Sequence, residues 1–445
     1  MRYGKILTIV MTIALLAVPV LNKTDTMNVS ADDIQLRFDL GGTPTDGITA
    51  VSASDEYQPE RGWGFIGDGA ENVEAGGSGA LSDAVQFNDN DTVFCTDIPN
   101  GLYKVSVTLG KTDHTGIYME DMLQIVNMTG NNAQDSVLVP VTDGQLNIRA
   151  AAGRKGPYTI SEIDILKISD TPELPRTIWI CGDSTVCNYY PIETSNQTGW
   201  GQVFDKFIDT SKWQVRDLAS GSQYAKGFLT SGQFDTIEHY GREGDIYIIS
   251  IGINDTLPKY SNEEEYYISV TEMTKRAKEK GMTVYLVKQQ GKATDASDKD
   301  MKERWFGSTL DRIGEEQDVK VLDLFSLFHD YCLSIGQQAT DELYVSNDPL
   351  HPNRKGAMIL AQMISDMIDW DEFEEPAVLG EANGDGVLNV RDAACIALML
   401  AKGKGDELAA QADFNEDGLI NVRDAAAIAE YLAGSKTASL PSVSR

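Results

Sequence analysis

The sequence predicts three folded parts in series: an all-β sandwich, a three-layer α/β/α domain and a small all-α module. The first part alternates apolar and polar residues in short stretches without a helical period. The second alternates apolar strands with helical segments, which is typical of a parallel sheet covered on both faces. The third contains two copies of one acidic segment, beginning at residues 381 and 413.

Length, charge and cysteine content limit the classes of protein that fit. A chain of 445 residues is too long for one ordinary core, so several domains are expected. Lys and Arg number 37 against 68 Asp and Glu, and the net charge of −31 argues against nucleic acid and anionic membranes as partners. The five cysteines have no repeating spacing and predict no disulfide framework, and whether any of them pair is left open.

The N-terminus has the pattern of a secretory signal. Arg2 and Lys5 precede an apolar run at 6–21, and small residues ending at Ala31 form a cleavage site. We therefore expect a signal peptide over 1–31 and a secreted, extracellular protein that is not held in a membrane after cleavage. A retained membrane anchor is the alternative, but the apolar run is short for a membrane span.

Residues 32–170 are predicted to form the β-sandwich. In "YKVSVTLG" the apolar side chains of Tyr103, Val105, Val107 and Leu109 alternate with polar ones, so they should share one buried face. A turn signal, "PNG", comes directly before this strand.

Residues 172–372 are predicted to form the α/β/α domain. Its strands include 177–180, 245–252 and 283–289, and 263–281 is helical and ends in basic residues and glycine. Ligands of such sheets bind at the carboxyl ends of the strands.

Four polar motifs fall on loops at that edge, and together they suit acyl transfer. They contain Ser184, Gly221, Asn254 and the pair Asp348 and His351. "ICGDST" follows the first strand and exposes Ser184, while "DPLH" near the end of the domain contains Asp348 and His351. We expect Ser184 to be the nucleophile, His351 its base and Asp348 the group that orients the imidazole. The other histidines, His114, His239 and His329, are expected on the surface or in packing.

The tetrahedral intermediate of acyl transfer needs hydrogen-bond donors for its oxyanion. The candidates are the backbone N–H groups of Ser184 and Gly221 and the side-chain amide of Asn254. We expect Asp183 to shape its loop and Asp255 to bond backbone within its own turn.

This ordered set of motifs resembles the SGNH (GDSL-like) hydrolase superfamily over about 172–372, which implies a flavodoxin-like three-layer fold. "IWICGDSTV" and the β-domain stretches "FDLGG", "GWGF" and "LNIRA" resemble rhamnogalacturonan acetylesterases with a galactose-binding-like N-terminal domain. The resemblance implies removal of O-acetyl groups from the pectic polysaccharide of plant cell walls, with no cofactor in catalysis. The aromatics Tyr57, Trp63 and Phe65 could bind glycan or pack in the core.

Two departures keep other substrates open. "KQQGKATDASDKD" stands where many relatives are Arg-rich, and "DPLHPNRKG" lacks the aromatic that often follows the histidine. Pectin is polyanionic, and a chain of charge −31 could offset that charge only locally, through Lys288, Lys292, Lys302 and Arg304. Acetylated xylan or another acetylated glycan is therefore an alternative. A non-catalytic carbohydrate-binding scaffold component is a second, but the intact serine, asparagine, aspartate and histidine argue against it.

After a linker at 373–379, residues 380–434 repeat a calcium-loop spacing, and the tail 435–445 is predicted to be disordered. Hard oxygen ligands at such spacing suit Ca²⁺. The predicted ligands are Glu381, Asn383, Asp385, Val387, Asn389 and Asp392 in the first loop, and Asp413, Asn415, Asp417, Leu419, Asn421 and Asp424 in the second.

Aspartate at loop position 12 and the doubling of the loop resemble a type I-like dockerin. The resemblance implies two structural Ca²⁺ ions and a cohesin module of a scaffold protein as the partner, in a cell-surface multienzyme complex of the cellulosome type. It implies cohesin contacts at Val390, Arg391, Val422 and Arg423.

Overall fold

The computed structural model describes residues 34–43, 45–112, 114–151, 157–373 and 378–434. They form two compact units that divide between Met367 and Ile368. The predicted signal peptide (1–31) and tail (435–445), and most of the predicted linker (373–379), lie outside the described residues, and the domain boundaries stay predictions. Among the described helices, none combines the length and apolar character that crossing a membrane requires.

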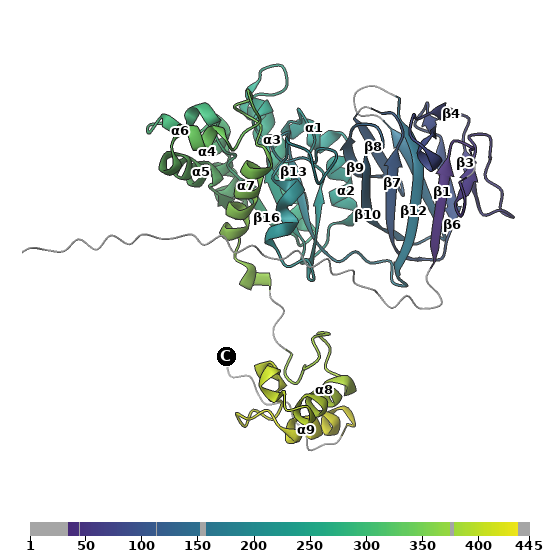
Figure 1. The fold of residues 1–445 in the computed structure, drawn as a ribbon. Helices are drawn as coiled ribbons and strands as arrows, with labels where there is room; N and C mark the ends of the chain where they lie inside the picture. The colour runs from purple at the N-terminus through teal and green to yellow at the C-terminus, as the bar shows by residue number, and fades with distance from the viewer. Residues whose placement is uncertain (1–33, 44, 113, 152–156, 374–377, 435–445) are drawn as a thin grey trace, which may run out of the picture. The chain divides into compact units, whose positions relative to one another are not determined.

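The N-terminal domain is a β-sandwich, as the sequence predicted (Figure 1). One sheet has the strand order β10-β7-β12-β1-β2, with β5 paired to β12 and β4 paired to β5, and the other has the order β3-β6-β11-β8-β9. The strands are β1 (Gln35–Leu40), β2 (Thr49–Val51), β3 (Trp63–Ile66), β4 (Ala70–Glu74), β5 (Asp83–Phe87), β6 (Val93–Asp97), β7 (Gly101–Leu109), β8 (Thr115–Met119), β9 (Met122–Met128), β10 (Gln134–Val141), β11 (Gln145–Ala151) and β12 (Thr159–Ser169), with the short helix η1 (Gly79–Leu81).

The alternation in β7 has the predicted consequence. Tyr103, Val105, Val107 and Leu109 are all fully buried in the core between the sheets. Successive side chains of a strand point to opposite faces, so one strand supplies four core residues.

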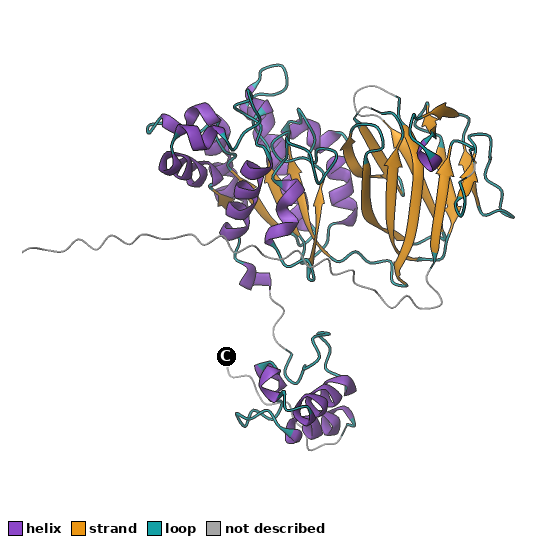
Figure 2. Cartoon of the chain, in the orientation of Figure 1, coloured by secondary structure: helices purple, strands orange, loops and turns teal. Residues whose placement is uncertain are grey.

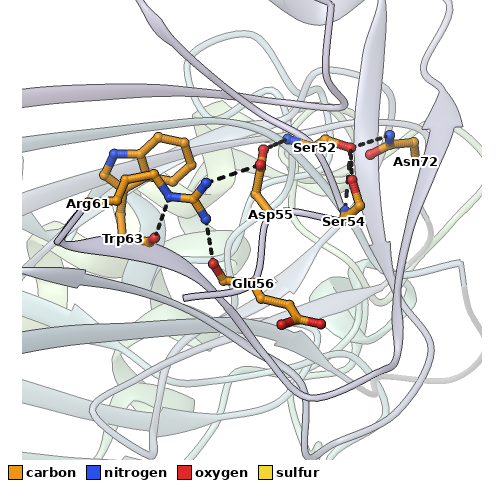
Figure 3. Close-up of polar contacts among 7 residues, drawn as sticks. All are labelled: Ser52, Ser54, Asp55, Glu56, Arg61, Trp63 and Asn72. Atoms are coloured by element: carbon orange, nitrogen blue, oxygen red, sulfur yellow. Dashed lines mark hydrogen bonds and ion pairs between the residues drawn. The ribbon is translucent and has the colours of Figure 1, made fainter. Parts of the chain in front are cut away.

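The three aromatics near β3 have partners within the protein, and Figure 3 shows those of Trp63, with Arg61 beside its ring. Phe65 is 3% exposed and lies in the core, where it meets Phe87 and Phe94 edge-on. The guanidinium of Arg61 lies 4.2 Å from the ring centroid of Trp63. Arg61 also pairs with Asp55, while Tyr57 donates a hydrogen bond to Asp97. Phe65 is therefore a core residue, whereas Tyr57 and Trp63 are half-buried at the surface of the sandwich.

The second domain is a parallel sheet with helices on both faces, which confirms the three-layer fold (Figure 2). Its strand order is β14-β13-β15-β16-β17. The strands are β13 (Arg176–Gly182), β14 (Trp213–Asp217), β15 (Ile246–Ser250), β16 (Thr283–Val287) and β17 (Lys320–Leu322). The helices are α1 (Ala225–Thr230), α2 (Gln233–Tyr240), α3 (Glu263–Glu279), α4 (Trp305–Gln317), α5 (Leu324–Ile335), α6 (Gln337–Asp341) and α7 (Arg354–Met367), with the short helices η2 (Gly201–Phe207), η3 (Asn254–Thr256), η4 (Ala293–Ser297) and η5 (Trp370–Phe373).

Local sequence explains these elements. All five residues of β15 are buried and apolar except its last serine, as expected for a central parallel strand. Asn262 caps α3, because its side chain accepts hydrogen bonds from the backbone N–H groups of Glu264 and Glu265. Three glutamates in the first turn of α3 add a favourable interaction with the helix dipole.

The strand order reverses at β13, which has the second strand of the domain, β14, on one side and the third, β15, on the other. The loops after β13 and β15 therefore diverge and leave a crevice at the carboxyl edge. Ligands of open α/β sheets bind at such a point.

The sandwich packs directly against the parallel-sheet domain. Leu102, Leu123 and Val126 of the sandwich belong to the same buried cluster as Trp179. Arg216, 6% exposed, donates to the side chain of Gln124 at 2.6 Å, and burial lowers the pKa of this arginine to about 10.

The C-terminal unit contains α8 (Val390–Ala401) and α9 (Val422–Leu432), with the short helices η6 (Gly405–Glu407) and η7 (Ala410–Ala412). Its core is small and centres on Ile396, Ala412, Phe414 and Ile428.

Candidate active site

Ser184, His351 and Asp348 form a hydrogen-bonded chain. Ser184 Oγ lies 2.9 Å from His351 Nε2, and His351 Nδ1 lies 2.6 Å from Asp348 Oδ2. The serine and the histidine are 167 residues apart in the sequence and meet only through the fold. This is the geometry of a nucleophile, a base and an orienting carboxylate.

The loop after β13 exposes the serine. Within residues 181–187 Ser184 is half-buried, whereas the other six residues are buried. The turn is tight at Gly182, where a Cβ atom would lie 2.5 Å from the side chain of Val186. Asp183 stays inside the loop, where it accepts hydrogen bonds from the backbone and hydroxyl of Thr185, in line with the expected shaping role.

The Asp348 side chain is held in its ionised form, which can accept a hydrogen bond from the imidazole of His351. Burial by itself would raise the pKa of Asp348, but hydrogen bonds from the Leu350 N–H and from His351 lower it below the usual value. Since the carboxyl is ionised at neutral pH, it favours a proton on His351 Nδ1. That tautomer leaves Nε2 free to accept the serine proton.

Asn353, which the sequence analysis did not single out, fastens the histidine loop. Its side-chain amide donates to the carbonyls of Glu342 and Tyr344, and its oxygen accepts from the Gly356 N–H at the start of α7. The last bond is an N-cap arrangement. The asparagine directly before a helical pattern was the available signal.

Asn254 and Gly221 lie on the two neighbouring loops. The Asn254 side-chain amide donates one hydrogen bond, 2.9 Å long, to the Gln223 carbonyl. A Cβ atom placed on Gly221 would meet nothing within 4 Å, so space is open at this residue.

Gln289, at the end of β16, connects the serine loop to the asparagine loop. Its amide nitrogen donates to Asp183 Oδ2 at 3.0 Å and to the Ser250 carbonyl at 3.1 Å, while its oxygen accepts from the Ile253 N–H at 3.1 Å. Gln289 is 1% exposed. The sequence predicted Gln289 only as the last residue of a strand over 283–289, and the "KQQ" segment otherwise only as a departure from relatives.

Asp255 bonds differently from the expectation. Its carboxylate accepts from the Ala225 N–H, at the start of α1, and so ties the asparagine loop to the glycine loop beyond its own turn. Burial raises the pKa of Asp255 to about 7.

Two of the basic residues considered for an anionic substrate are engaged elsewhere. Lys288 is 8% exposed and pairs with Glu303 and Asp311. Arg304 donates to the Gln290 carbonyl.

The other histidines also have defined places. His239 contacts Tyr240 and His329 stacks on Phe325. His114 borders a pocket that is described below. All five cysteines are free thiols, so Cys181 and Cys187 do not pair.

The predicted calcium loops fold as compact turns. In the first, one carboxylate oxygen each from Glu381, Asp385 and Asp392 lie within 4.8 Å of one another, a donor set that fits a hard cation. Asn389 and Asn421 cap α8 and α9, each reciprocated by the aspartate three residues later. The remaining predicted ligands, Asn383, Val387, Asp413, Asn415, Asp417, Leu419 and Asp424, lie in these loops or at the first turn of α9.

The predicted cohesin-contact residues are exposed at matching positions. Val390 and Val422 begin the two helices and are 69% and 67% exposed. Arg391 and Arg423 follow them and are also exposed.

Three family models match the chain. Residues 36–166 match a "Beta-agarase/YXIM esterase-like, galactose-binding domain-like" family, 180–359 match the "GDSL-like Lipase/Acylhydrolase family", and 379–433 match the "Dockerin type I domain". The dockerin match implies binding of calcium and of a cohesin.

A curated relative spans both of the first two matches. The chain is 42% identical over 348 residues to the "Uncharacterized esterase YxiM" of Bacillus subtilis, covering 76% of this chain and 91% of the relative. A crystal structure of the B. subtilis YxiM protein has a TM-score of 0.72 at 41% identity, covering 74% of this chain and 96% of that one. An acetylxylan esterase structure from Geobacillus stearothermophilus, at 16% identity and a TM-score of 0.36, covers 44% of this chain and 97% of its own, a likeness too weak to bear on the substrate.

The identity to YxiM extends over the sandwich and the sheet domain, and the GDSL match contains all three residues of the hydrogen-bonded chain. The chain therefore belongs to the GDSL-like lipase/acylhydrolase family and is a carboxylic-ester hydrolase with a galactose-binding-like domain and a type I dockerin.

Proposed function

We propose that this esterase removes O-acetyl groups from a plant cell-wall polysaccharide through Ser184, His351 and Asp348. The observation that carries the proposal is the continuous hydrogen-bonded path from Ser184 Oγ through the imidazole to Asp348. It provides a nucleophile, a base and an anion that stabilises the imidazolium.

In the proposed reaction Ser184 Oγ attacks the acetyl carbonyl carbon while its proton passes to His351 Nε2. The intermediate collapses, the sugar oxygen leaves with that proton, and the acetyl group stays on Ser184. Water then attacks the acetyl-enzyme with His351 as base, and acetate is released. No metal takes part in these steps.

The oxyanion of each intermediate is proposed to accept hydrogen bonds from the Ser184 and Gly221 N–H groups and the Asn254 amide. One amide hydrogen of Asn254 is used by the Gln223 carbonyl, which fixes the direction of the other. Loss of one such donor costs about 3 kcal/mol of transition-state stabilisation.

The resemblance to rhamnogalacturonan acetylesterases supports acetylated rhamnogalacturonan as the substrate. The engaged state of Lys288 favours a second candidate, acetylated xylan or another uncharged glycan, because this buried lysine is already paired with two carboxylates.

The C-terminal module is proposed to bind two structural Ca²⁺ ions and to attach the secreted enzyme to a cohesin-bearing scaffold. The exposed Val390–Arg391 and Val422–Arg423 pairs would contact the cohesin. Because the core is small, ion binding should contribute directly to folding.

The test of the mechanism is hydrolysis of 4-nitrophenyl acetate by Ser184→Ala, His351→Ala and Asp348→Asn. Each single variant should lower kcat by about 10⁴-fold or more, and the double variant Ser184→Ala/His351→Ala should be no worse than either alone, because the groups act as a unit. Losses that multiply in the double variant would refute the proposed unit.

A further inference from the structure

A pocket of about 220 Å³ lies between the sandwich and the sheet domain. The sandwich contributes His114, Tyr118 and Asn127 to its lining, and the other domain contributes Gly221, Gln223 and Gln233. Ser184 and His351 are not among the described lining residues, so the pocket adjoins the reacting groups without containing them.

The pocket meets the active site on the oxyanion side. Gly221 is a proposed oxyanion donor, and the Gln223 carbonyl accepts from Asn254. From the sandwich, the Asn127 amide nitrogen lies 4.0 Å from the Sγ of Cys187, which is three residues after the nucleophile. A molecule in the pocket would therefore contact the loop that carries Gly221 and Gln223.

The sandwich wall of the pocket is firmly placed. Figure 1 shows strand β9 beside helix α2, and Thr236 Oγ1 of α2 donates to the Leu123 carbonyl of β9 at 2.9 Å. The Arg149 guanidinium lies 3.9 Å from the ring centroid of Tyr118 and orients that ring. Asn127 has a φ of +63°, a left-handed conformation that is uncommon outside glycine and is often found at binding sites.

The lining chemistry fits a sugar. The Gln223 and Gln233 side chains bond each other and the Ser231 and Ser220 hydroxyls. The Asn127 amide and the Tyr118 hydroxyl can pair with sugar hydroxyls, and the Tyr118 ring can pack against the C–H face of a pyranose. Among the described lining residues there is no Lys, Arg, Asp or Glu. A uronate carboxylate would lose water here without gaining a cation from the lining, and the neighbouring Arg149 guanidinium is stacked on the Tyr118 ring, so an uncharged residue is favoured.

We propose that this pocket binds an uncharged sugar residue of the polysaccharide, adjacent to the residue that carries the acetyl ester. The inference rests on the proposed function and assigns the sandwich a direct part in choosing the substrate. The pocket holds about one sugar ring, so longer glycans would extend beyond it.

The kinetic test compares Asn127→Gly with Asn132→Gly. Both asparagines have positive φ, +63° and +58°, so glycine suits both backbones, but Asn132 is exposed and outside the pocket lining. On the acetylated oligosaccharide that wild type hydrolyses fastest, Asn127→Gly should lower kcat/KM about three- to tenfold, the equivalent of one hydrogen bond. Its activity on 4-nitrophenyl acetate, and both activities of Asn132→Gly, should be unchanged.

Binding to the inactive Ser184→Ala protein gives a second readout that needs no turnover. Calorimetric titration with xylohexaose and with a neutral galactan oligosaccharide should show binding of at least one, weakened by adding Asn127→Gly or Tyr118→Leu. Oligogalacturonate should bind more weakly.

Three results would overturn the pocket proposal: no effect of Asn127→Gly on the oligosaccharide, equal losses on both substrates, or tighter binding of oligogalacturonate than of the neutral probes. A Ser184→Ala protein that still releases acetate would instead refute the proposed mechanism.

Discussion

Replacing Gln289 by methionine removes a hydrogen-bonded link beneath the active site while nearly preserving side-chain volume. In the wild type this single amide holds Asp183, which precedes the nucleophile, and the Ile253 N–H, which precedes Asn254. Gln289 touches neither the serine nor the proposed oxyanion, so it acts as a positioning residue.

The cost can be worked from the groups left without partners. Methionine leaves Asp183 Oδ2 and the Ile253 N–H buried and unpaired, and each such group costs about 1–3 kcal/mol, more when charged. We therefore expect the free energy of unfolding to fall by about 4 kcal/mol. A displacement of the reacting groups by about 1 Å should lower kcat by about 100-fold, with KM for 4-nitrophenyl acetate little changed.

The assay combines urea unfolding with steady-state kinetics at a temperature where the variant is folded. Gln124→Met is the matched control, because Gln124 is also buried and hydrogen-bonded but lies at the contact between the domains. The control should lose stability and keep kcat. Equal kcat losses in both variants, or wild-type kcat in Gln289→Met, would refute the positioning role.

Gln289→Glu adds a pH signature. The new carboxyl would face Asp183, whose pKa burial already raises, so the two would share a proton most readily at low pH. The ratio of variant kcat to wild-type kcat should therefore rise as pH falls from about 8 to about 5. A flat ratio would argue against the direct contact with Asp183.

Three further predictions concern other parts of the chain. Asp255 has a pKa raised to about 7 in the folded state, so its unfavourable ionisation costs stability as pH rises from about 4 to 7. Between pH 5 and 8, Asp255→Asn should flatten that dependence by about 3 kcal/mol at most, measured by urea unfolding, and an unchanged slope would contradict it. Gly221→Ala should fold with wild-type stability, because an added Cβ atom meets nothing within 4 Å. It should nevertheless lower kcat/KM, because the methyl group enters the open space beside the proposed oxyanion donor. Unchanged kinetics would show that the substrate does not use this space. Chelation of Ca²⁺ should unfold the C-terminal module, which circular dichroism would detect, and should abolish cohesin binding. Esterase activity should remain. Loss of hydrolysis on chelation would contradict the metal-free mechanism.

The sequence was informative wherever local pattern decides structure. Alternation placed Tyr103 and its neighbours in the core, continuous apolar character identified β15, and the repeated loops indicated the dockerin. Ser184 and His351 could be proposed as catalytic from the sequence because each belongs to a short motif in a loop next to a strand or helix.

Long-range pairing had no such signal. Gln289 reaches Asp183 across 106 residues, and Asp255 reaches Ala225 across 30, so neither bond is visible in a local pattern. The pocket at Tyr118 and Asn127 exists only because two domains pack together, and His114 was expected merely on the surface or in packing.

The central claim is that Ser184 carries out deacetylation of a cell-wall polysaccharide. Acetate release should be measured from acetylated rhamnogalacturonan and acetylated xylan with wild type and Ser184→Ala. The account predicts release from at least one polymer by wild type and a loss of about 10⁴-fold in the variant. No release from either polymer, or equal release by the variant, would contradict it.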